Sequence, residues 1–349
     1  MYSSVHILLI PLYRRSKEKN KPDVNFFKSP LKQFIHHFTI MTGELAALGA
    51  SLLWAVASII FADIGRHIHA VNLNLIKGLF ACLLMFFLLL FGSLLDFTSL
   101  NLASLFSLSN KELLLLGISG VIGIGVGDTA YFACIRRIGA QKGLMLESTA
   151  PVLAALLALL FFQETLSLNS WMGILVTSTG VILVVKWSRA AFSYSTTAIG
   201  VLFGLLAAFC QASGIVISRK VFLSGDIDPL TSGLVRLSAA LLSIAVWLLL
   251  KKLLSPGKVA HQSTRSAMRL LIDHKLLIRL IGAITLGTFL AIWLMQTSVK
   301  FTSAGITQTL LATCPLFGMV IGRLQGQKQP AAVWFGLSLG VVGVSLLFL

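Results

Sequence analysis

Residues 143–162 read GLMLESTAPVLAALLALLFF, a largely apolar run interrupted by one acid, Glu147, and one proline, Pro151. A helix needs roughly 20 mostly apolar residues to cross the hydrocarbon core of a bilayer, so this run is long enough to span a membrane. The triplet Thr149-Ala150-Pro151 within it returns as Thr313-Cys314-Pro315 in a second apolar run. This stretch therefore predicts both a membrane protein and an internal repeat.

Segments of similar length and apolarity follow one another along most of the chain. Hydrophobic residues make up 56% of the sequence and charged residues only 11%, against about 25% charged residues in ordinary soluble domains. This composition excludes a soluble fold and predicts an all-α integral membrane protein with ten transmembrane helices. The expected spans are residues 44–62, 71–93, 113–133, 143–162, 169–187, 198–218, 229–250, 277–297, 302–321 and 331–349.

The two halves of the chain match each other at several places, in the same order. Residues 68–77 align with 227–236, Trp171-Met172-Gly173 with Trp334-Phe335-Gly336, and Gly180-Val181 with Gly343-Val344. Residues 43–190 are the first expected repeat and 198–349 the second, with five spans in each. Because five is odd, the second repeat must enter the membrane in the opposite direction. A 5+5 inverted-topology repeat of this kind is typical of secondary transporters.

Residues 1–42 differ from the rest of the chain. They are rich in Lys and Arg, and their one apolar run, residues 5–12, is too short to span a membrane. A secretory signal would place its charges before the apolar run, whereas here they follow it. Two interpretations stay open: a basic N-terminal tail, or translation that starts at Met41.

Several short motifs resemble the drug/metabolite transporter superfamily, in particular its ten-helix EamA-type members, over residues 43–349. The motifs are Leu53-Trp54, GDTAYF at 127–132, Ala150-Pro151-Val152, Glu164, Gly173 and Gly180, with Pro315, Gly336 and Gly343 in the second half. The resemblance implies a transporter of small metabolites, amino acids or drugs that usually works without ATP. The second half departs from it, because residues 326–328 lack an acid and Gln211 stands where the first half has Trp54.

Ionisable side chains inside the spans are the first candidates for a binding site, because each costs about 2.5–3.5 kcal/mol at mid-membrane on insertion scales. Lys77 and Arg236 lie at matching depths of the second and seventh spans and could each hold a substrate carboxylate. The alternative is that these long side chains reach the lipid headgroups. Asp128 and Tyr131 are expected to present polar groups to the interior from the third span.

Glu147 is the candidate for proton coupling. It lies one helical turn before Pro151, which removes a backbone donor and loosens that turn. The alternative is a plain hydrogen bond to a neighbouring helix. Its counterpart in the second half is Leu311, so a proton site would be asymmetric. Weaker candidates for cavity walls are Trp54, Gln211, Trp293 and Gln296.

Neither catalytic nor metal-binding residues are predicted, and we expect no cofactor. The sequence has no HExxH, GxSxG or DDxxD motif, and its histidines lie outside the apolar runs. The net charge of +16 does not indicate nucleic-acid binding, because the basic residues lie between spans. The expected partners are a small-molecule substrate, the lipid bilayer and a coupling proton, in a plasma membrane such as the bacterial inner membrane. A lipid-carrier flippase and a membrane-embedded lipid-modifying enzyme are the rival functions, and the oligomeric state stays open.

The distribution of Lys and Arg predicts the orientation. Beyond the tail, one set of loops holds Arg66, Arg136, Arg137, Lys186 and most other basic residues, while the opposite set holds only Lys111, Arg219, Lys220 and Lys300. Because basic loops stay in the cytoplasm, the C-terminus is expected outside it. A reporter that fluoresces only in the cytoplasm, fused after Leu349, should therefore give dark cells. Bright cells would contradict this orientation.

Overall fold

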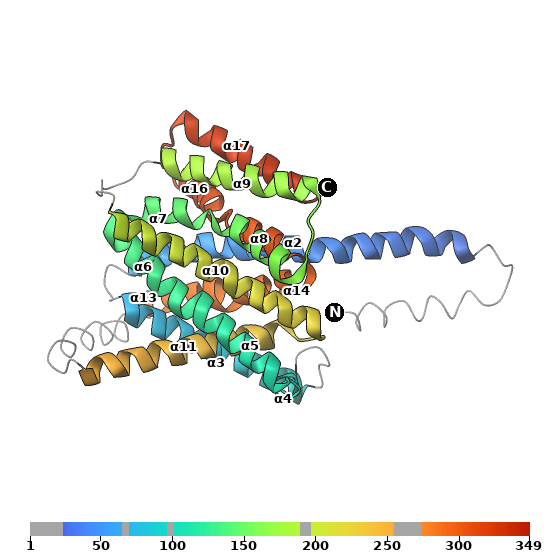
Figure 1. Cartoon of the computed structure of the whole chain (residues 1–349), viewed down its shortest axis with the longest axis horizontal. Helices are drawn as coiled ribbons and strands as arrows, with labels where there is room; N and C mark the ends of the chain where they lie inside the picture. The colour runs from blue at the N-terminus through green and yellow to red at the C-terminus, as the bar shows by residue number, and fades with distance from the viewer. Residues whose placement is uncertain (1–23, 65–69, 96–100, 189–196, 255–273) are drawn as a thin grey trace.

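The computed structural model describes residues 24–64, 70–95, 101–188, 197–254 and 274–349, and these form a bundle of helices joined by short connections (Figure 1). The first half contains α2 (Val24–Ile64), α3 (Ala70–Leu94), α4 (Ala103–Phe106), α5 (Asn110–Gly120), η1 (Val121–Val126), α6 (Gly127–Ile138), α7 (Ala140–Glu147), α8 (Ala150–Phe162) and α9 (Leu168–Trp187). The second half contains α10 (Ala198–Ser224), α11 (Pro229–Leu254), α13 (His274–Ile284), η2 (Thr285–Leu290), α14 (Ala291–Phe301), α15 (Ala304–Leu311), α16 (Cys314–Leu324) and α17 (Ala331–Leu346).

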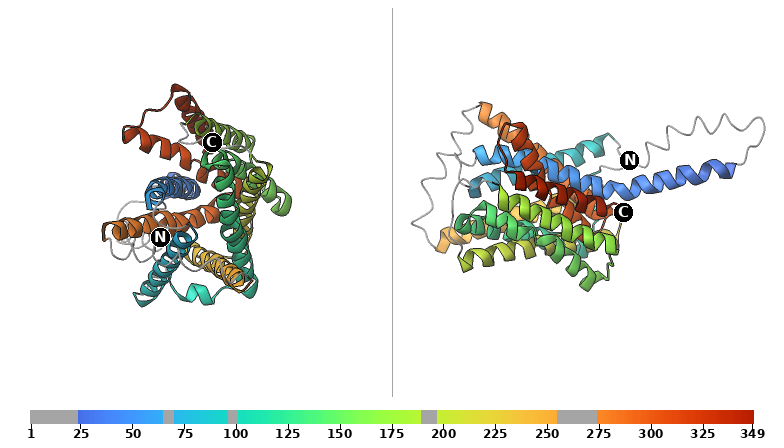
Figure 2. Two further views of the ribbon diagram at one scale, coloured as in Figure 1. Left: turned by 90° about the vertical axis from the view of Figure 1, so that its left-hand side faces the viewer. Right: turned by 90° about the horizontal axis from the view of Figure 1, so that it is seen from above.

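The all-helical membrane fold predicted from the sequence is confirmed. Within the described residues, nine helical stretches are long and apolar enough to cross a membrane, and α17 is a shorter apolar helix. One boundary was not predicted: α2 continues without interruption from the first span back to Val24. Figure 2 shows this extension projecting beyond the rest of the bundle.

The packing of the helices repeats between the two halves. The first span, α2, packs against η2 and α14, just as its counterpart α10 packs against η1 and α6. Equivalent spans also meet directly: the fourth and ninth through α8 and α15, and the fifth and tenth through α9 and α17. A two-fold rotation that exchanges the halves reproduces the packing of α2 and α10 against their partners and the contact of α9 with α17, so the predicted two-repeat architecture is present in the structure.

The contact between α9 and α17 explains the matched glycines. The two helices run antiparallel, so that Gly173 faces Leu347 and Gly180 faces Gly336 and Gly340. A Cβ added at Gly180 would collide with the Gly340 backbone and lie 2.8 Å from the Gly336 carbonyl oxygen. In lipid, where helices gain no hydrophobic driving force from each other, small residues allow this close approach and its dispersion energy.

Two distortions of the spans occur at matching positions in both halves and were not predicted. An α-helix of 11 residues leads into a π-helix in the third span and again in the eighth, giving η1 and η2. Each lies where a glycine meets a small residue of a neighbouring span, Gly123 against Gly214 and Gly287 against Ala57. π-Helical turns are rare and are found mostly at functional sites.

The second distortion interrupts the fourth and ninth spans. Each begins with a helix of 8 residues, α7 or α15, which ends just before a helix that carries proline in its first turn. Because proline lacks an N–H and crowds the preceding turn, it favours a break at this point. The predicted continuous spans 143–162 and 302–321 are therefore each two helices.

Gly180→Ala should weaken the bundle, because the new methyl group forces α9 away from α17. We expect a loss of about 1–3 kcal/mol, the usual cost of overpacking a tight contact. Thermal unfolding of the purified protein in detergent measures it, with Gly318→Ala as the control, because a Cβ at Gly318 meets nothing within 4 Å. Equal stability of the two variants would contradict the tight contact.

Candidate functional site

The two helix breaks, in the fourth and ninth spans, differ in the side-chain hydrogen bonds that their backbone carbonyl oxygens accept. In the ninth span, Ser51 Oγ of α2 donates to the Leu311 carbonyl oxygen at 3.2 Å and lies 3.0 Å from Thr313 Oγ1. In the fourth span, Ser148 and Thr149 donate only within the same helix, to the carbonyl oxygens of Leu144 and Leu146. The residue of the second repeat that matches Ser51 is Ala208, which has no hydroxyl group. The break beside Glu147 thus lacks the cross-helix support that its counterpart has.

A group of polar side chains surrounds this break, and we call it the acidic cluster: Lys77, Asp128, Tyr131, Glu147 and Gln211. Gln211 Nε2 of α10 donates to Asp128 Oδ1 at 3.4 Å. Lys77 of α3 acts electrostatically on Asp128, and Asp128 acts on Glu147 at the end of α7. Four spans therefore contribute charged or polar groups to one place.

Tyr131 belongs to the same group. Its ring lies 3.4 Å from the position of a Cβ on Gly143, and the charges of Glu147 and Asp128 both reach its hydroxyl. Glu147 also interacts with Cys314, the first residue of α16. Cys314 was not predicted as a site residue, although its place in the Thr313-Cys314-Pro315 triplet marks the second helix break and could have drawn attention to it.

The members of the acidic cluster lie at similar depth. Lys77 and Glu147 are each seven residues from the start of their helices, α3 and α7, and Asp128 is ten residues from the end of α6. At 1.5 Å per residue these distances are about 10–15 Å, all measured from the same end of the bundle. The Lys77 ammonium also lies 5.9 Å from the centre of the Phe61 ring. The cluster thus lies about two to three helical turns from this end of the bundle.

Arg236 and Gln296 are not part of the acidic cluster. Arg236 lies seven residues into α11, which begins at the opposite end of the bundle, and is 2% exposed. Gln296 lies in the middle of α14 and accepts a hydrogen bond from Ser218 Oγ at 3.0 Å. The predicted site residues therefore divide into two groups in opposite halves of the membrane.

The two tryptophans occupy the apolar core instead. Trp54 on α2 and Trp293 on α14 are both partly buried against it, and the Trp293 ring lies 6.2 Å from that of Phe289. Neither has a polar contact with the acidic cluster among the described residues. Their expected role as cavity walls stays a prediction.

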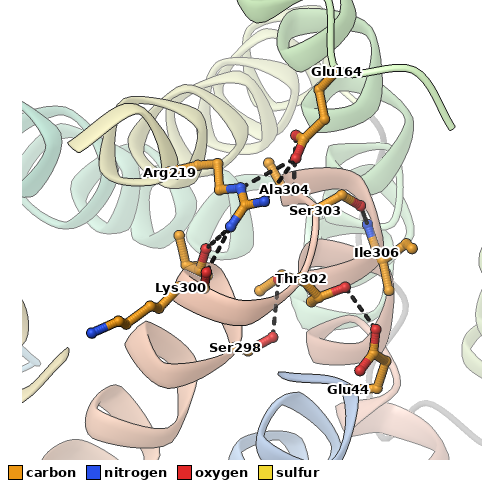
Figure 3. A network of polar contacts seen from close by, with 11 residues as sticks. Glu44, Glu164, Arg219, Ser298, Lys300, Thr302, Ser303, Ala304 and Ile306 are labelled. Carbon is orange, nitrogen blue, oxygen red and sulfur yellow. Dashed lines mark hydrogen bonds and ion pairs between the residues drawn. The ribbon is translucent and has the colours of Figure 1, made fainter. Parts of the chain in front are cut away.

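A network of polar contacts fastens the two halves together at the other end of the bundle (Figure 3). Arg219 Nε and Nη2 both lie 3.1 Å from Glu164 Oε1, and Arg219 Nη1 donates to the carbonyl oxygens of Val299 and Lys300. The Ala304 N–H donates to Glu164 Oε2 at 3.4 Å. Glu164, just after α8, therefore connects the first repeat directly to α10 and α15 of the second and, through Arg219, to the end of α14, and it is a structural residue.

Two other cations at this end also have contacts. Lys300 Nζ lies 2.6 Å from Asp226 Oδ1, and Lys220 Nζ lies 5.0 Å from the centre of the Phe162 ring. These are residues of the loops that carry few basic residues. Of these two cations, Lys300 is thus paired with a carboxylate, and the predicted orientation of the chain stays a prediction.

Comparison with known proteins identifies relatives over nearly the whole chain. The sequence model of the EamA-like transporter family matches residues 41–186 and 198–349. An uncharacterized transporter of Archaeoglobus fulgidus is 26% identical over 281 residues, which cover 80% of this chain and 88% of that protein. The uncharacterized transporter YdfC of Bacillus subtilis is 32% identical over 77 residues, 22% of this chain and 24% of that protein. One crystal structure, 13% identical, shares the fold with a TM-score of 0.65 over 87% of this chain and 95% of its own.

Arg219→Gln should destabilise the protein, because Glu164 then stays partly buried without its cation. We expect a loss of about 1–3 kcal/mol, the cost of leaving a buried polar group unsatisfied. Thermal unfolding in detergent measures this loss, and Lys328→Gln, which removes a cation from an exposed loop, should have no effect. A variant as stable as the unaltered protein would show that this network does not hold the halves together.

Proposed function

Because the chain belongs to the EamA-like transporter family, we propose that it is a secondary transporter that carries a small metabolite, amino acid or drug across the plasma membrane by alternating access. The observation that supports this most is the acidic cluster beside the interrupted fourth span. Transporters commonly bind substrate and coupling ion where helices are discontinuous and repeats meet. Helix breaks inside a membrane are tolerated only where protein or a water-filled cavity surrounds them.

The chemistry of the acidic cluster suits a solute that carries charge. Lys77 can attract an anionic group, Asp128 and Glu147 a cationic group, and Gln211 can donate or accept hydrogen bonds. Ionisable residues within a span are expensive in lipid, so their concentration in one place favours a substrate or ion pathway over a structural role. The cluster is accordingly the proposed binding and coupling site.

Asp128 and Glu147 are the proposed coupling pair. Two carboxyls within reach of each other's charge repel when both are ionised, so the gain or loss of one proton changes the net charge of the site. The Glu147 turn, weakened by Pro151 and without a partner like Ser51, is the part of the site best able to change shape with that charge. Protonation could therefore be linked to the opening of one side.

Alternating access follows from the repeated distortions. The two π-helices and the two interrupted spans occupy matching positions, so each half contains the same deformable segments. The two halves are inverted relative to each other. A conformation that opens the site to one side of the membrane when the first half adopts it therefore opens the site to the opposite side when the second half adopts it. The pseudo-symmetry thus supplies both states.

A lipid-carrier flippase is the second candidate function, and one observation favours it. Two cavities of about 550 and 690 Å³ lie between α5 and α11, and α3 borders the first. They are open and apolar, with exposed Leu83, Phe86, Leu113 and Leu242 in their walls. A lipid tail fits such a lining, but the acidic cluster does not border either cavity.

Reconstitution into liposomes separates these functions and the membrane-embedded enzyme. The purified full chain should drive counterflow of a labelled solute from a panel of amino acids, organic acids and cationic drugs. Movement of a lipid-linked substrate alone would support the flippase instead. Chemical conversion without any flux would overturn transport and support an enzyme.

Glu147→Gln should abolish transport driven by a pH gradient while solute counterflow persists, because the amide keeps the shape of the site but cannot release a proton. Initial rates in proteoliposomes, with and without the gradient, measure this effect. Glu112→Gln, at the start of α5 and outside the acidic cluster, is the matched control and should transport normally, because glutamine can keep the bond to the Ser109 N–H. Gradient-driven transport by the Glu147 variant at the normal rate would rule out the proposed coupling role.

A further inference from the structure

Arg236 is a buried cation for which the protein supplies no counter-charge. Its Nε and Nη1 atoms are fully enclosed and form no hydrogen bond to any described residue. Neither the Arg219–Glu164 nor the Lys300–Asp226 ion pair of the described residues includes it. Its side chain lies next to Gly123 in η1, where Nη2 is 3.5 Å from the position of a Cβ. A buried cation without an acceptor is strongly unfavourable, so this arrangement points to a ligand.

Other buried donors face the same region. Gln296 Oε1 accepts from Ser218, which leaves Gln296 Nε2 as a buried donor without a partner. The Gln296 side chain packs 3.8 Å from the position of a Cβ on Gly233, one turn before Arg236 on α11. Ser232, one turn before Arg236 in the i−4 position, has a buried hydroxyl that also lacks a partner. We call Ser218, Ser232, Arg236 and Gln296 the arginine cluster.

The two halves of the protein show why the arginine cluster lacks an anion. Arg236 is the repeat counterpart of Lys77, whose charge is balanced by Asp128 and, beyond it, Glu147. The residues at the corresponding places of the second half are Ile292 and Leu311, both apolar. Ile292 lies 3.3 Å from the position of a Cβ on Gly233, so it does face α11 as Asp128 faces its own site. The protein thus keeps the cation but has replaced the acids.

We propose that the arginine cluster binds a carboxylate, and that the transported solute is a small organic anion. The inference rests on the proposed transport function and names the class of its substrate. A guanidinium offers paired N–H donors that match the two oxygens of a carboxylate, and the Gln296 amide adds another donor. The cluster lies about 10 Å from the end of the bundle opposite to the acidic cluster. The solute therefore meets one cation in each half of the protein. Arg236 has N–H donors without partners, whereas Lys77 already has protein carboxyls within reach of its charge.

Binding can be measured without transport. The purified full chain in detergent, in a buffer low in small anions, is titrated with acetate and with its neutral isostere acetamide while thermal unfolding is followed. Acetate should raise the unfolding temperature, because a ligand that binds only the folded state stabilises it, and acetamide should not. Stabilisation by chloride but not by acetate, or by neither, would overturn the carboxylate site.

Arg236→Met tests the residue itself. The variant should lose the acetate effect, and without acetate it should unfold at or above the temperature of the unaltered protein, because an unpartnered buried charge has been replaced by an apolar chain of similar length. Marked instability without acetate would show that Arg236 is a structural clamp instead. Arg236→Lys, which keeps the charge but not the fork of donors, should bind acetate about ten-fold more weakly.

Two further variants complete the test. Gln296→Leu should weaken acetate binding but leave some response, and Lys220→Gln, which removes an exposed cation of α10, should leave it unchanged. If the liposomes show no flux but acetate stabilises only proteins that keep Arg236, the proposed transport function is wrong and the carboxylate site is supported. If Arg236→Met carries organic anions at the normal rate, the site fails and transport stands.

Discussion

The hydrocarbon core of the membrane offers no water to a polar group, and this single constraint governs the molecule from backbone to binding site. It requires helices, because only they satisfy their own N–H and C=O groups within one segment. It also makes every departure from a regular helix informative. The break after Leu311 is supported by the Ser51 hydroxyl, whereas the break after Glu147 lies among charged side chains. The irregular places are therefore also the polar places.

The two repeats share the same arrangement of helices but differ in the charged residues that they place inside it. One half places Asp128 within reach of its basic residue, Lys77, and the other buries Arg236 with no carboxyl partner among the described residues. In the proposed mechanism, the symmetric arrangement of helices allows the two halves to exchange conformations, while the two clusters offer the solute different charged groups.

Much of the fold was predictable because it depends on composition and spacing. The apolar runs predicted the spans, and matched motifs such as Gly173 with Gly336 predicted the repeat, which the antiparallel packing of α9 and α17 explains. The helix interruptions were only half visible: Pro151 marked a weak turn, but the length of α7 follows from packing against other spans. The π-helices left no signature, because they arise where Gly123 meets Gly214, residues far apart in the chain.

The candidate residues were predictable one by one, but not as groups. Depth along each helix indicated Lys77, Asp128, Glu147 and Arg236, because charges in apolar runs are conspicuous. Their division into an acidic and an arginine cluster depends on which helices are neighbours, and Cys314 joins the first only through the crossing of the fourth and ninth spans. The partner of a buried charge is a property of tertiary structure. No pattern in the sequence therefore shows that Arg236 lacks a counter-charge.

The glycine contact between α9 and α17 has a further consequence. Its two surfaces are equivalent by the pseudo-two-fold axis, so the contact is self-complementary in the manner of a symmetric dimer interface. Two identical five-helix chains inserted in opposite directions could form the same contact with no change in its residues. The covalent link between the repeats then has a different role: it fixes a one-to-one ratio of two halves that are free to diverge, so that acids can be kept at one site and lost from the other.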